Sequence, residues 1–203
     1  MSTPRLPVTL FARLPAALHY RGEPTEWVRV TRPGQRLHSF LEGPCFDAAG
    51  HLWLVDVPYG RIFRVAPDGG WTLAHAYDGE PHGLARLADG AFAFAVTDYR
   101  RGVLRLDRDG ALTPLVTGVN SENFRGLGDI AAGPDGSLWF ADPGRSSLTD
   151  PSGRLFRLRP GAAAAEPVLV NIPYPNGIAL SPDGRFVHVA ATRANAVWRL
   201  LAD

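Results

Sequence analysis

Four stretches of the chain share one pattern, in which a polar turn containing a glycine is followed by a short apolar strand. The stretches are DAAGHLWLVDV, LADGAFAFAVT, GPDGSLWFADP and SPDGRFVHVAA, with turn glycines at Gly50, Gly90, Gly136 and Gly184. The spacings between these glycines are 40, 46 and 48 residues. A period of this length indicates a repeat architecture.

A second apolar strand follows each of these at a similar distance, in GRIFRVAPDG, GVLRLDRDG, GRLFRLRPG and NAVWRLLAD. Its apolar and polar residues alternate, which is typical of a half-buried β-strand. The Asp-Gly pairs predict hairpin turns, because Gly tolerates positive φ and Asp bonds to its own backbone. Each repeat therefore contains several antiparallel strands and no helix. This pattern predicts an all-β chain with the fold of a β-propeller.

The repeats predict one domain over residues 1–203. It has an N-terminal arm or outer strand at 1–33 and blade-like repeats near 40–80, 81–125, 126–172 and 173–203. The chain ends in WRLLAD, where the earlier repeats pass through a turn into another strand. We therefore expect an incomplete propeller of about four blades. Its exposed blade edges could pair between chains, so self-association is an alternative way of closing it.

The composition excludes several classes of function. Twenty-one basic residues against 20 acidic ones leave a net charge of +1, so no overall field attracts nucleic acid or anionic lipid. Every basic residue is Arg, which excludes Schiff-base lysines and the lysine of a nucleotide-binding P-loop. The single cysteine, Cys45, excludes an intramolecular disulfide. The N-terminal segment shows neither a signal peptide nor a membrane span, and we expect a cytoplasmic protein.

Functional residues of a propeller should recur just before the first strand of each blade, because that strand lines the central channel. Four segments occupy this place: LEGPCFD, GEPHGLA, FRGLGDIA and YPNGIAL. Their polar residues are Glu42, Glu80 or His82, Asp129 and Asn176. Convergent oxygen atoms suit a hard cation such as calcium, which takes about six to eight oxygen ligands. The alternative is that these residues only cap turns and bond to neighbouring backbone.

These segments resemble the SMP-30/gluconolactonase/LRE-like family of sugar lactonases, which are six-bladed propellers. The matching motifs follow the family order from about residue 34 to 203: FLEGPCFD, LVDVPYGRIFRV, YDGEPHGLA, ENFRGLGDIAAGPDGSLWFADPG, DPSGRLFRLRPG, IPYPNGIALSPDGR and TRANAVWRL. The resemblance implies that the four repeats belong to a six-bladed architecture.

The resemblance also implies one divalent cation in the channel, most often calcium, with zinc, magnesium or manganese as alternatives. Its ligands would include Glu42 of the EGP motif and Asn176 of the PNG motif. Such a cation polarises a lactone carbonyl and lowers the pKa of the attacking water. We expect Asp129 to be catalytic, and His82 and Arg125 to lie beside the substrate. Phosphotriesterases and luciferin-regenerating proteins share the superfamily, so fold and metal do not determine the substrate.

The chain departs from the family pattern at three places. Gly128 stands where the family commonly has Asn, and His82 where it usually has Asn. A further metal-binding Asp, followed by Gly, is expected beyond residue 203. Asp129 could replace the missing amide, but strand alternation directs its side chain the other way. With two ligands retained, a divalent ion should bind weakly.

Two functions follow as hypotheses. The first is metal-dependent hydrolysis of a sugar-type lactone or a related small ester. The second is a non-catalytic remnant or a small-molecule-binding propeller, whose metal site is incomplete.

Overall fold

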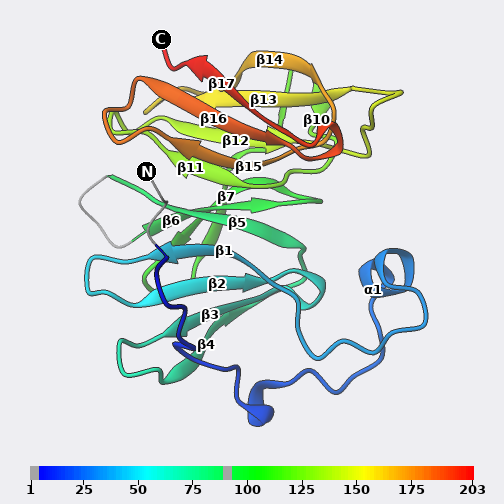
Figure 1. Cartoon of the computed structure of the whole chain (residues 1–203), viewed down its shortest axis with the longest axis vertical. Coiled ribbons are helices and arrows are strands. Elements are labelled where there is room, and N and C mark those ends of the chain that lie inside the picture. Colours follow the sequence, from blue (N-terminus) through cyan, green and yellow to red (C-terminus); the bar gives the residue numbers. More distant parts are fainter. Residues whose placement is uncertain (1–4, 89–92) are drawn as a thin grey trace.

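The computed structural model describes residues 5–88 and 93–203, and within them four antiparallel β-sheets lie side by side (Figure 1). Each sheet keeps its strands in chain order, as expected for blades built from consecutive hairpins. The predicted all-β propeller with four blade-like repeats is therefore confirmed. Blades 1, 2 and 3 have four strands and blade 4 has three.

The strands of the four blades have the following bounds. Blade 1 contains β1 (Leu41–Phe46), β2 (Leu52–Asp56), β3 (Arg61–Val65) and β4 (Trp71–Ala76); blade 2 contains β5 (Pro81–Arg86), β6 (Ala93–Asp98), β7 (Gly102–Asp107) and β8 (Leu112–Val116). Blade 3 contains β11 (Ile130–Ala132), β12 (Leu138–Asp142), β13 (Gly153–Leu158) and β14 (Glu166–Ile172); blade 4 contains β15 (Pro175–Leu180), β16 (Phe186–Ala191) and β17 (Ala196–Leu201). A small hairpin of β9 (Gly118–Val119) and β10 (Glu122–Asn123) connects blades 2 and 3.

The apolar residues of neighbouring blades pack against each other in three clusters. One lies between blades 1 and 2 around Trp53 and Phe94, and one between blades 2 and 3 around Phe140 and Phe156. The third lies between blades 3 and 4 around Trp139 and Val189. Because blade 3 is covered on both faces, β12 is buried along its whole length, whereas β16 in blade 4 alternates between buried and partly exposed residues.

The turns before the second strands follow the predicted chemistry. Gly50, Gly136 and Gly184 have φ values of 82°, 80° and 70°, which a side chain would disfavour. Asp47 bonds within its own turn, since its Oδ1 accepts the N–H groups of Ala49 and His51, each at 2.9 Å. The fourth predicted turn glycine, Gly90, lies outside the described residues.

The N-terminal region, expected as an arm or an outer strand, contains two short helices and no strand within its described residues 5–33. They are η1 (Ala16–Leu18) and α1 (Glu26–Thr31); the other short helices are η2 (Val57–Tyr59) and η3 (Thr192–Ala194). The sequence pattern did not predict α1, because this six-residue helix is too short to show an apolar period. Thr25 caps it by accepting the Val28 N–H at 3.4 Å. None of the helices in the described residues is long and apolar enough to cross a membrane.

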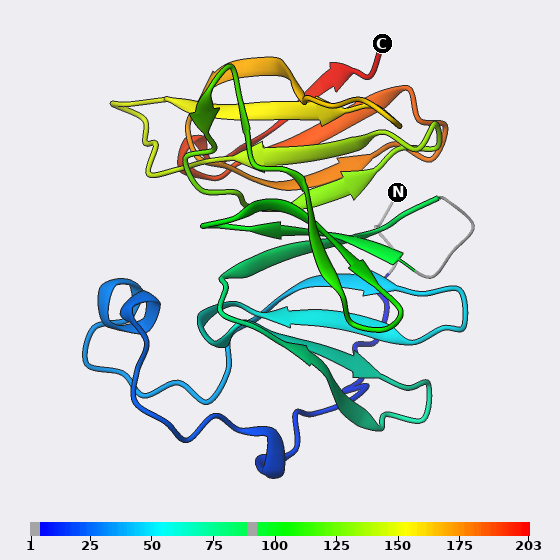
Figure 2. The ribbon, with the colours of Figure 1, turned by 180° about the vertical axis from the view of Figure 1, so that it is seen from behind.

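Contacts with blade 1 hold the arm in place. The ring of Tyr20 stacks on that of Tyr59 with centroids 3.7 Å apart, and the guanidinium of Arg61 donates to the carbonyl of Leu18 at 2.7 Å. The side chain of Val28 is fully buried. The arm therefore carries α1 to one side of the stacked sheets, where it stands apart from them (Figures 1 and 2).

A fully buried aspartate ends the second strand of blades 1, 2 and 3: Asp56, Asp98 and Asp142. Each accepts backbone N–H groups from the segment that precedes the first strand of its own blade. Asp56 accepts the Phe40 N–H at 2.7 Å, and Asp98 accepts the Glu80 N–H at 2.8 Å.

Asp142 makes the most complete set of such bonds. Its Oδ1 accepts the N–H groups of Arg125 and Gly126 at 2.8 and 3.0 Å, and its Oδ2 pairs with Arg154 on β13. In blade 4 the corresponding strand ends in Ala191, and the Oγ of Ser146 instead accepts the Tyr174 N–H at 3.0 Å. These contacts position the segments that the sequence marks as functional.

We expect Asp142→Ala to lower the free energy of unfolding by about 3–5 kcal/mol, because the Arg154 guanidinium and two N–H groups lose their buried partner. Urea denaturation would measure this change. The control is Asp150→Ala at an exposed position, where we expect a change within about 0.5 kcal/mol. Equal effects of the two substitutions would show that the buried carboxylate does not hold the blade.

Candidate functional site

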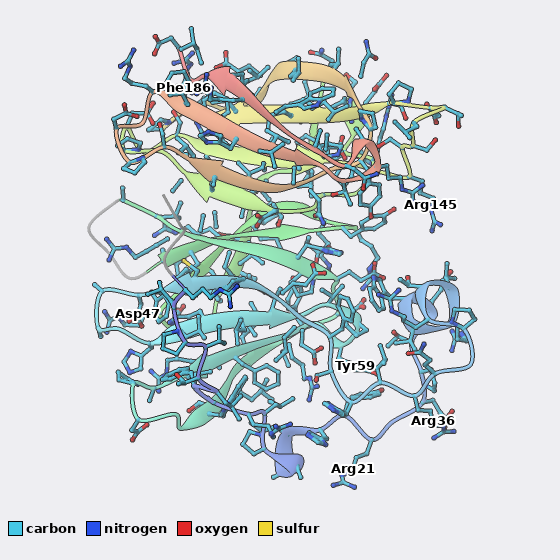
Figure 3. The ribbon with its side chains drawn as sticks, viewed as in Figure 1. Arg21, Arg36, Asp47, Tyr59, Arg145 and Phe186 are labelled. Carbon is cyan, nitrogen blue, oxygen red and sulfur yellow. The ribbon has the colours of Figure 1, made fainter. Side chains whose placement is uncertain are left out.

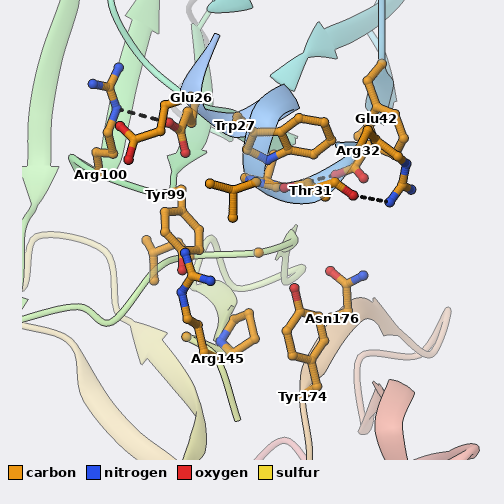
Figure 4. Close-up of a pocket in the computed structure, with 18 of the residues that line it drawn as sticks. Glu26, Trp27, Thr31, Arg32, Glu42, Tyr99, Arg100, Arg145, Tyr174 and Asn176 are labelled. Carbon is orange, nitrogen blue, oxygen red and sulfur yellow. Dashed lines mark hydrogen bonds and ion pairs between the residues drawn. The ribbon is translucent and has the colours of Figure 1, made fainter. Parts of the chain in front are cut away.

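A cavity of about 770 Å³ lies between α1 and the loops and first strands of the four blades. Each blade contributes polar or aromatic groups to its wall. They are Phe40 and Glu42 from blade 1, Glu80, His82, Tyr99 and Arg100 from blade 2, Arg145 from blade 3, and Tyr174, Asn176 and Arg193 from blade 4; Gly128 of blade 3 also lines the cavity. Figure 4 shows Trp27 and Thr31 of α1 on one side of the cavity and Arg145 and Tyr174 on the other.

Irregular pairing turns three of the expected residues toward this cavity. The register of β1 shifts between Glu42 and Cys45, that of β5 between Pro81 and Gly83, and that of β15 between Pro175 and Ile178. Each shift leaves one unpaired extra residue on the inner strand, which bends the strand and redirects nearby side chains. His82 and Asn176 lie inside these bulges, and Glu42 lies at the edge of one.

The glycine of the EGP motif follows from the same geometry. Gly43 has a φ of 58°, and a Cβ on it would lie 2.8 Å from the backbone oxygen of His82 and 3.0 Å from the Cα of Gly83. Only glycine permits this close approach of β1 to β5. The approach brings Glu42 next to His82.

Glu42 and His82 form the most direct polar contact of the site. The Nδ1 of His82 and the Oε2 of Glu42 are 3.0 Å apart, and the two side chains are 17% and 34% exposed, respectively. A carboxylate only accepts, so the proton of this bond belongs to Nδ1. The Nε2 of His82 is enclosed and has no hydrogen-bond partner among the described residues.

Asn176 lies beside Gly128, the position where the family pattern predicts Asn. A Cβ added to Gly128 would be 3.1 Å from the Oδ1 of Asn176 and 3.4 Å from the ring of Pro143. Both residues line the cavity. The missing side chain at position 128 would therefore have entered the cavity next to the amide of Asn176.

Asp129 points away from the cavity wall, as strand alternation predicted. Its Oδ2 accepts the Ile178 N–H of β15 at 3.1 Å, and its Oδ1 lies against Gly83. Burial raises the pKa of the Asp129 carboxyl, while the N–H groups of Ile178 and Ile130 oppose this shift. Asp129 thus connects the inner strands of blades 3 and 4, and it is absent from the cavity lining.

Arg125 does not reach the cavity in this structure. Its backbone N–H bonds to Asp142, and its guanidinium donates to the carbonyl of Ser152 at 2.8 Å. The structure therefore brings Glu42, His82 and Asn176 together but places Asp129 behind the wall and Arg125 outside it. The Arg125 side chain turns to the loop that follows β12, and its contact with a substrate stays a prediction.

Several lining residues were missed by the sequence reading. Trp27 and Arg32 lie in or next to α1, and Arg145 and Arg193 follow the second strands of blades 3 and 4. Tyr174 precedes Asn176 by two residues and could have been found from that spacing. The others carry no motif, since only the folded chain brings them to the cavity.

Two of the lining residues offer oxygen atoms to a divalent cation. Glu42 and Asn176 offer a carboxylate and an amide oxygen to the same cavity, which suits a hard cation. In residues 5–88 and 93–203 no group of three or more His, Cys, Asp and Glu side chains is arranged to hold a metal ion. The residues fit a cation that takes two ligands from this chain and its remaining ligands from water or substrate.

Sequence comparison gives relatives of known name. The chain is 29% identical over 180 residues to the lactonase drp35 of Staphylococcus saprophyticus, which covers 86% of this chain and 53% of that protein. It is 27% identical over 183 residues to the lactonase drp35 of Staphylococcus aureus, covering 87% and 54%. The chain spans about half the length of these curated relatives.

Solved structures share the fold. A gluconolactonase from Xanthomonas campestris superposes with a TM-score of 0.72 at 22% identity, over 81% of this chain and 59% of that one. The calcium-binding protein regucalcin from Agrobacterium tumefaciens superposes with a TM-score of 0.65 at 23% identity, over 81% and 54%. At these identities the likeness shows the propeller fold alone.

The family comparison covers the whole propeller of this chain. Residues 40–203 match the SMP-30/gluconolactonase/LRE-like region, beginning just before Glu42 and including all four blades. The chain therefore belongs to the SMP-30/gluconolactonase/LRE-like family.

Proposed function

We propose that the chain hydrolyses a lactone or a related small ester in this cavity, with a divalent cation held by Glu42 and Asn176. The observation that carries the proposal is that blades 1, 2 and 4 bring Glu42, His82 and Asn176 to one cavity. The names of the relatives, lactonase and gluconolactonase, support the reaction class. A sugar-type lactone is the proposed substrate.

The proposed cofactor is calcium, because the two available donors are hard oxygen atoms. The calcium-binding relative with the same fold supports this choice, and zinc, magnesium and manganese are the alternatives. When bound, such a cation polarises the lactone carbonyl and makes a bound water more acidic.

His82 has a clear positioning role toward Glu42. Its Nδ1–H occupies Oε2 of the carboxylate at 3.0 Å and leaves Oε1 for another partner. This bond keeps the carboxylate in one orientation. Contact of His82 with the substrate stays a prediction.

Asp129 is the proposed proton-transfer residue. Hydrolysis needs one proton to leave the attacking water and one to reach the ring oxygen as its bond to the carbonyl carbon breaks. A carboxyl whose pKa is raised by burial suits such a transfer. Because Asp129 lies behind the wall, the proton would pass through a bridging water or after a rotation of the side chain.

The test of this proposal combines calorimetry with an activity assay. We expect the native chain to bind calcium, and Glu42→Gln to weaken that binding at least about tenfold, because the site loses its carboxylate charge. The rate of acid release from glucono-1,5-lactone, measured at constant pH, should also be lower in Glu42→Gln than in the native chain. Glu23→Gln, which removes an exposed carboxylate paired with Arg36, should change neither quantity.

Binding of no calcium, zinc or manganese by the native chain would remove the basis of the metal proposal. Equal lactone hydrolysis by the native chain and Glu42→Gln would contradict the role of this carboxylate.

A second candidate function is a binding propeller that does not catalyse, and Gly128 is the observation that favours it. The position faces Asn176 but supplies no ligand. In this case the cavity would bind a small molecule without turning it over.

Gly128→Asn distinguishes the two functions. The new Cβ needs only a small shift of the Asn176 amide, so the variant should fold and offer a second amide oxygen. We expect about a tenfold gain in calcium affinity, since affinity for hard cations rises with the number of ligands. Gly128→Ala, which adds the Cβ without a donor, is the matched control in the same calorimetric titration.

If lactone hydrolysis appears only in Gly128→Asn, the native chain is the binding propeller. Equal hydrolysis by the native chain and Gly128→Asn would favour the enzyme. Equal calcium affinity of the Asn and Ala variants would show that position 128 does not face the cation.

A further inference from the structure

The helix α1 forms a wall of the cavity although it lies outside the propeller. Residues 26–32 precede the family-matched region, which begins at residue 40, yet Trp27, Val30 and Thr31 all line the cavity. The Trp27 ring packs on Phe40 with centroids 5.0 Å apart. This part of the wall therefore depends on the arm of this chain and not on the matched blades.

The charged residues of the wall comprise three carboxylates and four guanidinium groups: Glu26, Glu42, Glu80, Arg32, Arg100, Arg145 and Arg193. Glu80 pairs with Arg100 at 3.6 Å, and Glu26 lies beside Arg100 (Figure 4). On the opposite side, Arg145 and Arg193 form no ion pair with any carboxylate among the described residues. These two guanidinium groups are therefore available to an anionic ligand.

Aromatic rings accompany these two arginines. The guanidinium of Arg193 lies 4.9 Å from the centre of the Tyr174 ring, and Tyr174 faces Trp27 across the cavity (Figure 4). Arg145 lies on the same side of the stacked sheets as α1 (Figure 3). The ring of a ligand in this cavity would pack against the aromatic side chains, and its edge would face the two guanidinium groups.

A guanidinium binds a carboxylate through two parallel N–H···O bonds, which neutral hydroxyl groups do not match. We propose that Arg145 and Arg193 select a lactone that carries a carboxylate group, and that Trp27 packs against its ring. Trp27, Arg145 and Arg193 are then specificity-determining residues. This inference rests on the proposed function, of which it names the substrate class.

The test uses two probes that cannot be hydrolysed as lactones. They are 5-oxopyrrolidine-2-carboxylate and its neutral carboxamide, which have the same ring and differ in one charge. We expect the full chain to bind the carboxylate about tenfold more tightly at low salt, as charge-assisted hydrogen bonds allow. Added salt should reduce this preference, because it screens exposed charges. Calorimetry or NMR titration measures both affinities.

Arg145→Gln and Arg193→Gln should each reduce the preference several-fold, and the double variant should abolish it. The matched control is Arg199→Gln, since Arg199 lies 4.7 Å from the ring centre of Phe186 and so makes the same kind of contact as Arg193. Phe186 lies in another part of the molecule, away from Arg145 (Figure 3). Equal affinity of the native chain for both probes, or a preference that survives the double variant, would overturn the inference.

Trp27→Ala should lower the affinity for both probes to a similar degree, about threefold or more, because contact with the ring does not depend on the charge of the probe. Trp27→Phe should restore part of the affinity. The ratio of the two affinities should stay as in the native chain. Unchanged affinity for both probes in Trp27→Ala would show that α1 does not contact the ligand.

The outcomes separate this inference from the proposed function. If the chain hydrolyses no lactone but retains the Arg145-dependent and Arg193-dependent preference, the reaction proposal fails and the carboxylate site stands. If it hydrolyses neutral lactones and shows no preference for the carboxylate probe, the reaction stands and the inference fails.

Discussion

Buried carboxylates hold the segments that precede the first strands of blades 1, 2 and 3. Asp56, Asp98 and Asp142 are fully buried and accept backbone N–H groups from the same place in each blade. A buried carboxylate is stable only where such donors and a cation or hydroxyl satisfy it. Arg61, Tyr77 and Arg154 complete these sets. These hydrogen bonds therefore hold the segments that line the cavity on the second strands of their blades.

Hydrogen bonds and close contacts also connect the first strands of neighbouring blades. The hydroxyl of Thr97 accepts the Gly83 N–H at 2.8 Å and donates to the carbonyl of Gly128 at 2.5 Å. Asp129 makes the next connection, from blade 3 to Ile178 of blade 4. Glycines at positions 43 and 83 allow the strands to approach so closely. Side chains from three blades thus reach one cavity, and a shift of one blade would separate them.

The cavity combines parts of different origin within one chain. Its polar residues Glu42, His82 and Asn176 come from inner strands of the matched family region, whereas Trp27 comes from the arm before it. The part of the wall that α1 forms can therefore change without a change in the inner strands of the blades. The loops of a propeller, like those of other scaffolds, carry such variation without disturbing the core.

The turn glycines and the alternation of apolar residues in the sequence were enough to predict the propeller, because hairpin turns and half-buried strands depend on local preferences. The spacing of the repeats also predicted that Glu42, His82 and Asn176 belong to the segments around the first strands of their blades. Strand alternation predicted that Asp129 faces away from the side taken by Gly128. The helix α1 was missed because one and a half turns show no period.

Only the tertiary structure decided which of these residues share a cavity. The bulges that turn His82 and Asn176 inward depend on the pairing of whole strands, and the place of Arg125 depends on a contact with Ser152 in a distant loop. Trp27, Arg145 and Arg193 meet across the cavity because the arm packs on blade 1 and the blades pack on each other. Sequence patterns describe the neighbours along a strand, whereas such contacts arise between segments far apart in the chain.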